Sequence, residues 1–150
     1  MKKGVRGIYK SYNHNNSPFQ KGDKGGLKMS IAYQDWIELY TKWLENSICV
    51  EYLKNRISYI TTPFLDRHND LIAVYVQPTD NGFLISDEDA IPDLQTCTIY
   101  AETSKKLNGI LLNHGLTLDN EILTKHTTVE TFGKDFHYFI QALIEIYTLS

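Results

Sequence analysis

The stretch Leu71–Ser86, LIAVYVQPTDNGFLIS, predicts the centre of the fold. Its first part, Leu71–Gln77, is dense in branched and aromatic residues, which is typical of a buried β-strand. Pro78–Gly82 interrupts the run, and its Asn-Gly pair supplies the positive φ that a tight hairpin needs. Phe83–Ser86 then returns as the partner strand. We therefore expect an antiparallel hairpin in the middle of the protein.

Two further strands are predicted before this hairpin. Cys49–Lys54 and Ile57–Thr62 are rich in β-branched and aromatic residues that partly alternate with polar ones. Pro63 is expected to end the second of them, since proline cannot donate to a strand ladder. With the hairpin, these segments predict an antiparallel β-meander.

An amphipathic helix is predicted upstream, over about residues 31–47, with Ser30 as its N-cap. Apolar residues recur there at helical spacing: Tyr33, Trp36, Ile37, Tyr40, Trp43, Leu44 and Ile48. Two tryptophans and two tyrosines on one face are consistent with a ligand box or with packing into a core. The helical spacing favours core packing.

The C-terminal third is predicted to be mostly helical. The expected elements are a short helix at Ile91–Leu94, a helix at about Thr103–Asn113 that stops at Gly115, a small hairpin of Leu116–Leu118 and Ile122–Thr124, and a last helix at Gly133–Tyr147. The fold class is therefore α+β: an N-terminal helix, an antiparallel β-meander, then C-terminal helices with a small hairpin.

Composition limits the classes of protein to consider. The chain has 150 residues, of which 42% are hydrophobic and 22% charged, as in a single globular domain. No apolar run approaches the ~20 residues that cross a bilayer, and no signal peptide follows Met1. Cys49 and Cys97 form no C-x-x-C pair, so both are expected to be reduced, buried and inert. We expect a cytoplasmic protein without a membrane segment.

The charge is distributed unevenly along the chain. Residues 1–28 carry seven Lys/Arg and one acid, net +6, whereas residues 29–150 carry eight Lys/Arg and seventeen acids, net −9. A basic segment is typical of a nucleic-acid-binding arm. The glycine-rich, repeat-like run at 15–26 and a possible ribosome-binding codon string before Met29 favour a disordered leader ahead of the native start. We therefore expect one α+β domain at 29–150, whose negative charge disfavours nucleic acid.

The segment Thr61–Asp70, TTPFLDRHND, joins two predicted strands and is dense in polar residues. Its pattern T-P-F-x-D-R-x-x-D resembles the signature of the bacterial and phage domain-of-unknown-function family 1828. The resemblance extends over about residues 32–149 and implies the same order of helix, strands and helices. At 85–90, ISDEDA, the chain lacks the glycine of the family's second turn. The resemblance implies a phage-related or mobile-element protein and transfers no activity.

Five polar residues form the candidate functional cluster: Asp66, Arg67, His68 and Asp70 before the hairpin, and Asp87 after it. Because the two hairpin strands are antiparallel, Asp70 and Asp87 should lie at the same end of the sheet. Three interpretations stay open. The acids cap backbone N–H groups with Arg67 paired to them, or the cluster is a binding surface, or Asp66, Asp70 and Asp87 hold Mg²⁺ or Mn²⁺.

No recognisable catalytic motif accompanies this cluster. The sequence has no P-loop, no dinucleotide-binding glycine fingerprint and no G-x-S-x-G elbow. His114, His126 and His137 lack zinc-ligand spacing with cysteine. We therefore predict a small acidic protein-interaction or regulatory module with an unidentified protein partner and no cofactor. The alternative is a divalent-metal-dependent, nuclease-like hydrolase.

Overall fold

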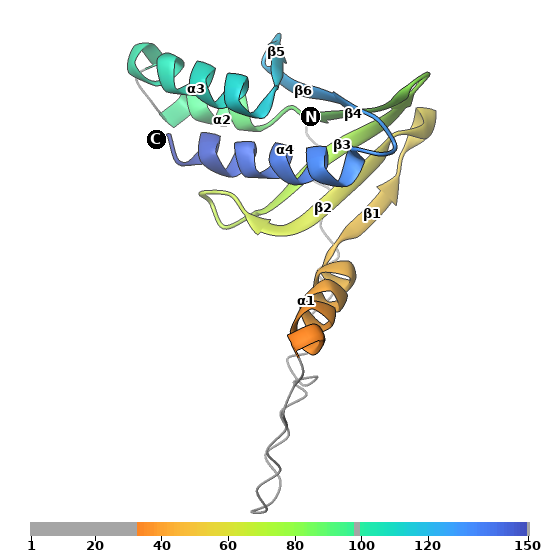
Figure 1. Cartoon of the computed structure of the whole chain (residues 1–150). Coiled ribbons are helices and arrows are strands. Elements are labelled where there is room, and N and C mark those ends of the chain that lie inside the picture. The colour runs from red at the N-terminus through yellow and green to blue at the C-terminus, as the bar shows by residue number, and fades with distance from the viewer. Residues whose placement is uncertain (1–32, 98–99, 150) are drawn as a thin grey trace, which may run out of the picture. The chain divides into compact units, whose positions relative to one another are not determined.

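The computed structural model describes residues 33–97 and 100–149. The elements are, in chain order, α1 (Tyr33–Ser47), β1 (Cys49–Tyr52), the 3-10 turn η1 (Lys54–Arg56), β2 (Ser58–Leu65), β3 (Leu71–Thr79), β4 (Gly82–Asp87), α2 (Ala90–Cys97), α3 (Tyr100–His114), β5 (Thr117–Asp119), β6 (Ile122–Thr127) and α4 (Phe132–Tyr147) (Figure 1). This order confirms the predicted α+β class. The predicted leader and the start at Met29 lie outside the described residues.

The described strands form one six-stranded sheet in the order β1-β2-β3-β4-β6-β5, and every neighbouring pair is antiparallel. Strands β1 to β4 are the predicted meander. The C-terminal hairpin was predicted only as a local element, but it joins the sheet because β6 pairs with β4, with Ile85 opposite Lys125. The chain therefore leaves the sheet after β4, forms α2 and α3, and returns beside the strand it left.

The helices α2, α3 and α4 build the core on one face of the sheet. Helix α4 contacts β4 and β6, and α2 and α3 pack against α4 (Figure 1). In β3, Ile72, Val74 and Val76 are buried while Ala73 and Tyr75 between them are half-buried. This alternation marks a sheet with one covered face. The buried residues of α4 are Phe139, Ile140, Ala142, Leu143, Ile146 and Tyr147.

Helix α1 covers the described part of the predicted helix, whose expected N-cap Ser30 lies outside the described residues, but it does not pack as predicted. Trp36 is 62% exposed, Tyr40 57% and Trp43 53%. The expectation that this aromatic face packs into the core is therefore wrong. Periodicity shows that a helix has an apolar face, and it does not show whether the same chain covers that face. None of the described helices is long and apolar enough to cross a bilayer.

Strand β2 runs through Pro63, which was expected to end it. The pairing with β3 shifts register between Thr61 and Leu65. Three residues of β2, 62–64, here face the single residue Ile72 of β3, so the ladder is interrupted and a proline without an N–H group is tolerated. Thr62 is buried, and its hydroxyl donates to the carbonyl oxygen of Ile72 on β3 at 2.8 Å. The side chain thus holds the two strands together beside the irregularity.

The expected burial of both cysteines is wrong for Cys49. This residue begins the edge strand β1, and its thiol is free and exposed. A four-residue edge strand has no second strand or helix to cover it, which explains the exposure. The side chain of Cys97 lies outside the described part of the structure.

A substitution at Gly82 tests how closely β4 and β6 approach each other. The residue has φ +150°, and a Cβ atom there would collide with the backbone carbonyl of Thr127. We expect Gly82→Ala to lower the free energy of unfolding by about 2–4 kcal/mol, because the strands must separate. Gly109→Ala in α3, where nothing lies within 4 Å of the added atom, should stabilise by up to about 1 kcal/mol. Urea unfolding measures both, and equal effects would contradict the proposed clash.

Candidate functional site

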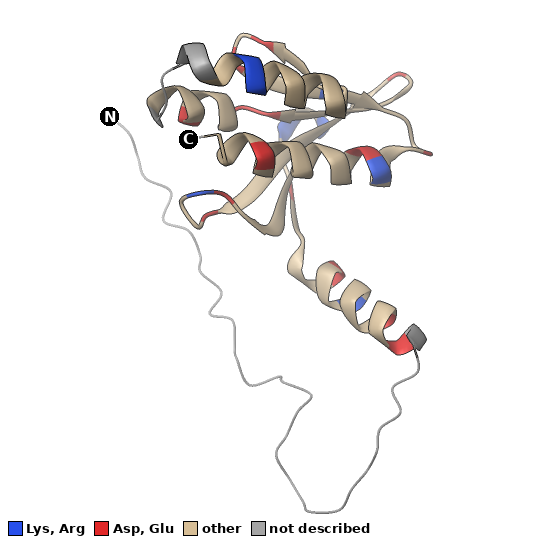
Figure 2. Cartoon of the chain, turned by 60° about the vertical axis from the view of Figure 1, so that its left-hand side comes forward, with Lys and Arg blue, Asp and Glu red and all other residues tan. Residues whose placement is uncertain are grey.

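The loop between β2 and β3 (residues 66–70) meets the entry to α2 at one end of the sheet. Acidic residues mark both segments in Figure 2. They border a pocket of about 310 Å³ whose polar lining comprises Tyr59, Asp66, His68, Asp70, Asp87, Asp89, Asp93 and Tyr147. Asp70 and Asp87 thus border the same hollow, as their strands predict. Of the five candidate residues, Arg67 alone is not part of this lining.

Asp66 organises the backbone of the loop. Its Oδ1 atom accepts hydrogen bonds from the backbone N–H groups of His68, at 2.8 Å, and Asp70, at 2.9 Å. The backbone N–H of Asp66 also donates to the carbonyl oxygen of Asp70 at 2.9 Å. Asn69 takes the left-handed conformation, with φ +63°, that closes the turn. One carboxylate oxygen of Asp66 is therefore committed to the loop itself.

Arg67 points to α2 and pairs with Asp93. Its Nε donates to Asp93 Oδ2 at 2.7 Å, and its Nη2 lies 2.6 Å from the same oxygen. The guanidinium carbon is 6.0 Å from the ring centroid of Tyr147 in α4, within the range of a cation–π contact. Nη1 and Nη2 are both buried and make no hydrogen bond with a described residue, although Nη2 takes part in the ion pair. The carboxylate of Asp93 and the ring of Tyr147 together compensate for the desolvation of this cation.

Asp93 is the shared acceptor of this arrangement. Its second oxygen, Oδ1, lies 2.9 Å from His68 Nε2. Burial alone would raise the pKa of Asp93, but the hydrogen bonds from His68 and Arg67 and the charge of Arg67 outweigh it and lower this pKa. The carboxylate of Asp93 is therefore held ionised by two residues of the candidate cluster.

Asp87 caps the start of α2. Only 3% of the residue is exposed, and its Oδ2 accepts the backbone N–H of Ala90 at 2.9 Å. Burial raises the pKa of Asp87 to about 6, with further contributions from the charges of Asp89 and Glu88, while the hydrogen bond from Ala90 opposes the shift. Burial, and then the charges of the pocket aspartates Asp87, Asp66, Asp89 and Asp93, raise the pKa of Tyr147. The pocket is thus a region of concentrated negative charge.

The arrangement favours the capping interpretation of the cluster. Asp66 and Asp87 bind backbone N–H groups, and Arg67 and His68 bind a carboxylate. In the described ranges, no three His, Cys, Asp or Glu side chains are arranged to hold a metal ion. The set Asp66, Asp70 and Asp87 therefore gains no geometric support as a metal site, and Mg²⁺ or Mn²⁺ binding stays an untested prediction.

Two important residues of the site escaped the sequence analysis. Asp93 binds Arg67 across 26 residues of sequence, and Tyr147 comes from the last turn of α4. No short motif spacing links these segments, so only the packing of α2 and α4 on the sheet brings them to the loop. One general rule was available: an arginine that becomes buried is almost always paired with an acidic residue. This rule does not say which acid would pair with Arg67.

A second polar network lies away from the loop, between β6 and α4. Lys125 donates to the carbonyl oxygen of His114 at 2.6 Å and lies 3.7 Å from Asp135. Asp135 accepts a hydrogen bond from Thr127 at 2.7 Å, and His114 contacts Glu145 at 3.1 Å. Helix α3, predicted to stop at Gly115, ends at His114. These contacts join α3, β6 and α4, so the network has a structural role.

A protein-family model matches more than half of the chain. The model of the family described as "Domain of unknown function DUF1828" matches residues 62–146, from the second half of β2 into α4. The matched range is shorter than the expected 32–149 and leaves out α1 and β1. No curated protein and no solved structure matches the chain.

The pH dependence of stability tests the environment of Asp87. Because its folded-state pKa is raised from 3.8 to about 6, the ionised carboxylate costs stability above pH 6, and this cost disappears as the pH falls towards 4. Asp87→Asn keeps an oxygen that can cap Ala90. We expect it to raise the free energy of unfolding at neutral pH by up to about 3 kcal/mol and to flatten the profile in this interval.

Asp87→Ala is the matched control, since it removes both the charge and the cap. The loss of the cap alone costs about 1 kcal/mol. Urea unfolding at a series of pH values measures all three proteins. An Asp87→Asn variant less stable than the wild type at neutral pH would contradict the burial penalty.

Arg67 and His68 test the pairing with Asp93. We expect Arg67→Ala to lower the free energy of unfolding by about 2–3 kcal/mol. Without Arg67, the carboxylate of Asp93 keeps only the contact with His68, whose side chain is half exposed. His68→Ala should cost less than about 1 kcal/mol, since half of the His68 side chain is exposed. A double-mutant cycle with Asp93→Ala measures both couplings. A coupling free energy near zero between Arg67 and Asp93 would show that the contact does not stabilise the fold.

Proposed function

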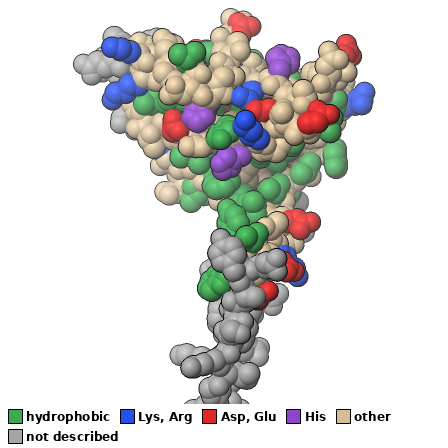
Figure 3. All heavy atoms as spheres, in the orientation of Figure 1, with side chains coloured by type: hydrophobic (Ala, Val, Ile, Leu, Met, Phe, Trp, Pro, Cys, Tyr) green, Lys and Arg blue, Asp and Glu red, His purple; other side chains and the backbone are tan. Residues whose placement is uncertain are grey.

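This chain belongs to the family described as domain of unknown function DUF1828, and we propose that it acts as a protein-interaction module. The aromatic face of α1 carries the proposal. Trp36, Tyr40 and Trp43 are each more than half exposed, and the rings of Tyr40 and Trp43 stack at 6.0 Å. Hydrophobic side chains gather on the surface where the sheet adjoins α1 (Figure 3).

The composition of this face supports a protein as the partner. Tryptophan and tyrosine are the residues that most often dominate the binding energy of protein interfaces. A contiguous exposed apolar surface of this kind, flanked by polar residues, marks an interaction site more often than an isolated exposed leucine does. Helix α1 therefore has the character of a docking helix.

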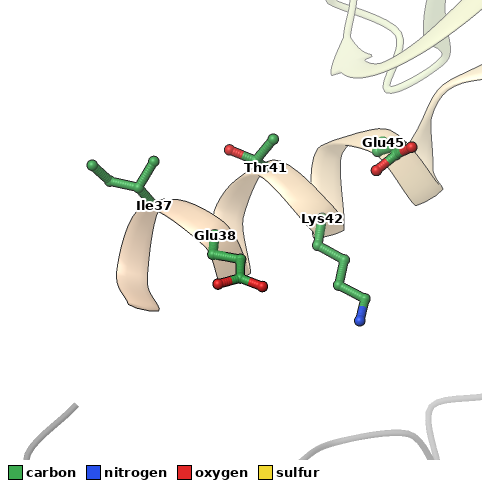
Figure 4. A pocket seen from close by; sticks show the side chains of 5 residues that line it. All are labelled: Ile37, Glu38, Thr41, Lys42 and Glu45. Carbon is green, nitrogen blue, oxygen red and sulfur yellow. The ribbon is translucent and has the colours of Figure 1, made fainter. Parts of the chain in front are cut away.

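The polar flank of α1 disfavours other classes of partner. Asp35, Glu38 and Glu45 outnumber Lys42 there. Figure 4 shows a pocket on this flank whose labelled residues, including Glu38, Lys42 and Glu45, all come from successive turns of α1. Helices that bind anionic membranes or nucleic acid carry Lys and Arg in such positions. A net acidic flank is repelled by both.

The loop cluster supports the proposal indirectly. Asp66, Arg67 and Asp87 are engaged in internal contacts, so no described feature favours the metal-dependent hydrolase. His68 and Asp70 are exposed on the rim of the acidic pocket and remain a second candidate surface for a basic protein. The expectation of a cytoplasmic, phage-related protein is part of the proposal.

Affinity purification of the full chain from its native host tests this function. We expect a stoichiometric protein with the wild-type chain and an affinity lower by roughly 30-fold or more in a Trp36→Glu, Trp43→Glu variant. A Leu112→Glu variant, which puts the same charge on an exposed apolar residue of α3, is the matched control and should bind normally. Equal loss in both variants, or retention in the aromatic variant, would refute the role of this face.

A further inference from the structure

We propose that one partner of this module is a second copy of the same chain, joined through the free edge of β1 and the exposed face of α1. This inference rests on the proposed function and specifies its partner. In the described sheet β1 has only β2 as a neighbour, so its other side is an open edge. Open edges present unpaired N–H and C=O groups to another strand.

The backbone of β1 shows which groups are available. The N–H of Leu53 donates to the carbonyl oxygen of Ile57 at 2.8 Å, so the backbone N–H and C=O groups of Leu53 point toward β2. In an antiparallel pair the direction of these groups alternates along the strand. The backbone N–H and C=O groups of Glu51 therefore also point toward β2. Those of Val50 and Tyr52 point toward the open side. Four backbone groups are thus placed to pair with another strand.

The side chains of this edge are uncovered, and all but Glu51 are apolar. All four residues of β1 are exposed, and so is Leu53 directly after it. Tyr52 is 86% exposed, the highest value among the large apolar residues of the described surface. Only Ile48 separates β1 from α1. The open edge and the aromatic face of α1 therefore lie in one continuous segment, 33–53.

The charges on the two sides of β1 are opposite in sign. Helix α1, before β1, carries Asp35, Glu38 and Glu45 against one cation, Lys42, while Lys54 and Arg56 follow β1 in η1. A two-fold axis that pairs two β1 strands in antiparallel fashion brings the end of each strand beside the start of the other. The basic turn of one copy then lies beside the acidic helix of the second copy.

The central acid of β1 selects the register. A pairing with Glu51 opposite Glu51 places like charges together, which is destabilising. A pairing centred on Val50 opposite Val50 separates the two acids, and the N–H and C=O groups of Val50 can then bond to the same groups of the second copy. A four-residue edge with one helix is small compared with the ~1,600 Å² of a standard interface. We therefore expect a dimer that dissociates on dilution.

Sedimentation velocity of the full chain over a wide range of concentration tests the inference. The wild type should pass from monomer to dimer. Val50→Pro should be monomeric and folded, because the N–H that it removes is unpaired in the monomer. Tyr52→Lys, which puts a charge on the edge, serves if the proline variant does not fold. Leu112→Lys in α3, where Leu112 is 83% exposed, is the control and should still dimerise.

The outcomes separate this inference from the proposed function. A wild-type chain that is monomeric throughout, or a dimer that persists in Val50→Pro and Tyr52→Lys, overturns the inference. If a monomeric chain still captures another protein through the aromatic face of α1, the proposed function stands without the second copy. If neither self-association nor capture depends on that face, both fail.

Discussion

The contact between Arg67 and Asp93 is the interaction on which the arrangement of this domain depends most. It joins three segments that are distant in sequence: the β2–β3 loop, α2, and through the ring of Tyr147 the end of α4. A buried guanidinium is tolerated only with an anionic partner and a face on which to lie. The loop, the capped start of α2 and the last turn of α4 must therefore form together.

The same constraint explains the T-P-F-x-D-R-x-x-D pattern. Thr62 ties β2 to β3 beside the register shift that accommodates Pro63, Asp66 shapes the turn, and Arg67 connects the turn to α2. The range matched by the family, 62–146, begins at this pattern and includes Asp93. It leaves out α1 and β1, the segment with the exposed apolar surface. The matched part is thus the scaffold, and the preceding segment carries the proposed interaction surface.

Sequence patterns predicted the elements better than their contacts. The alternation in β3, the stop at Gly115 and the apolar stripe of α4 depend on neighbouring residues, so a single sequence shows them. The pairing of β6 with β4 and of Arg67 with Asp93 depends on tertiary packing, for which spacing gives no signal. The aromatic face of α1 was misjudged for a related reason. An apolar face covered by its own chain and one covered by a partner have the same helical periodicity.

The two tryptophans of the chain, Trp36 and Trp43, allow a direct test of this account, because both lie on α1. The decisive measurement is quenching of tryptophan fluorescence by acrylamide in a monomeric sample at high dilution. With more than half of each side chain exposed, the account predicts emission like that of tryptophan in water and efficient quenching. Blue-shifted emission that resists quenching in the monomer would contradict it, since α1 would then be buried in its own domain.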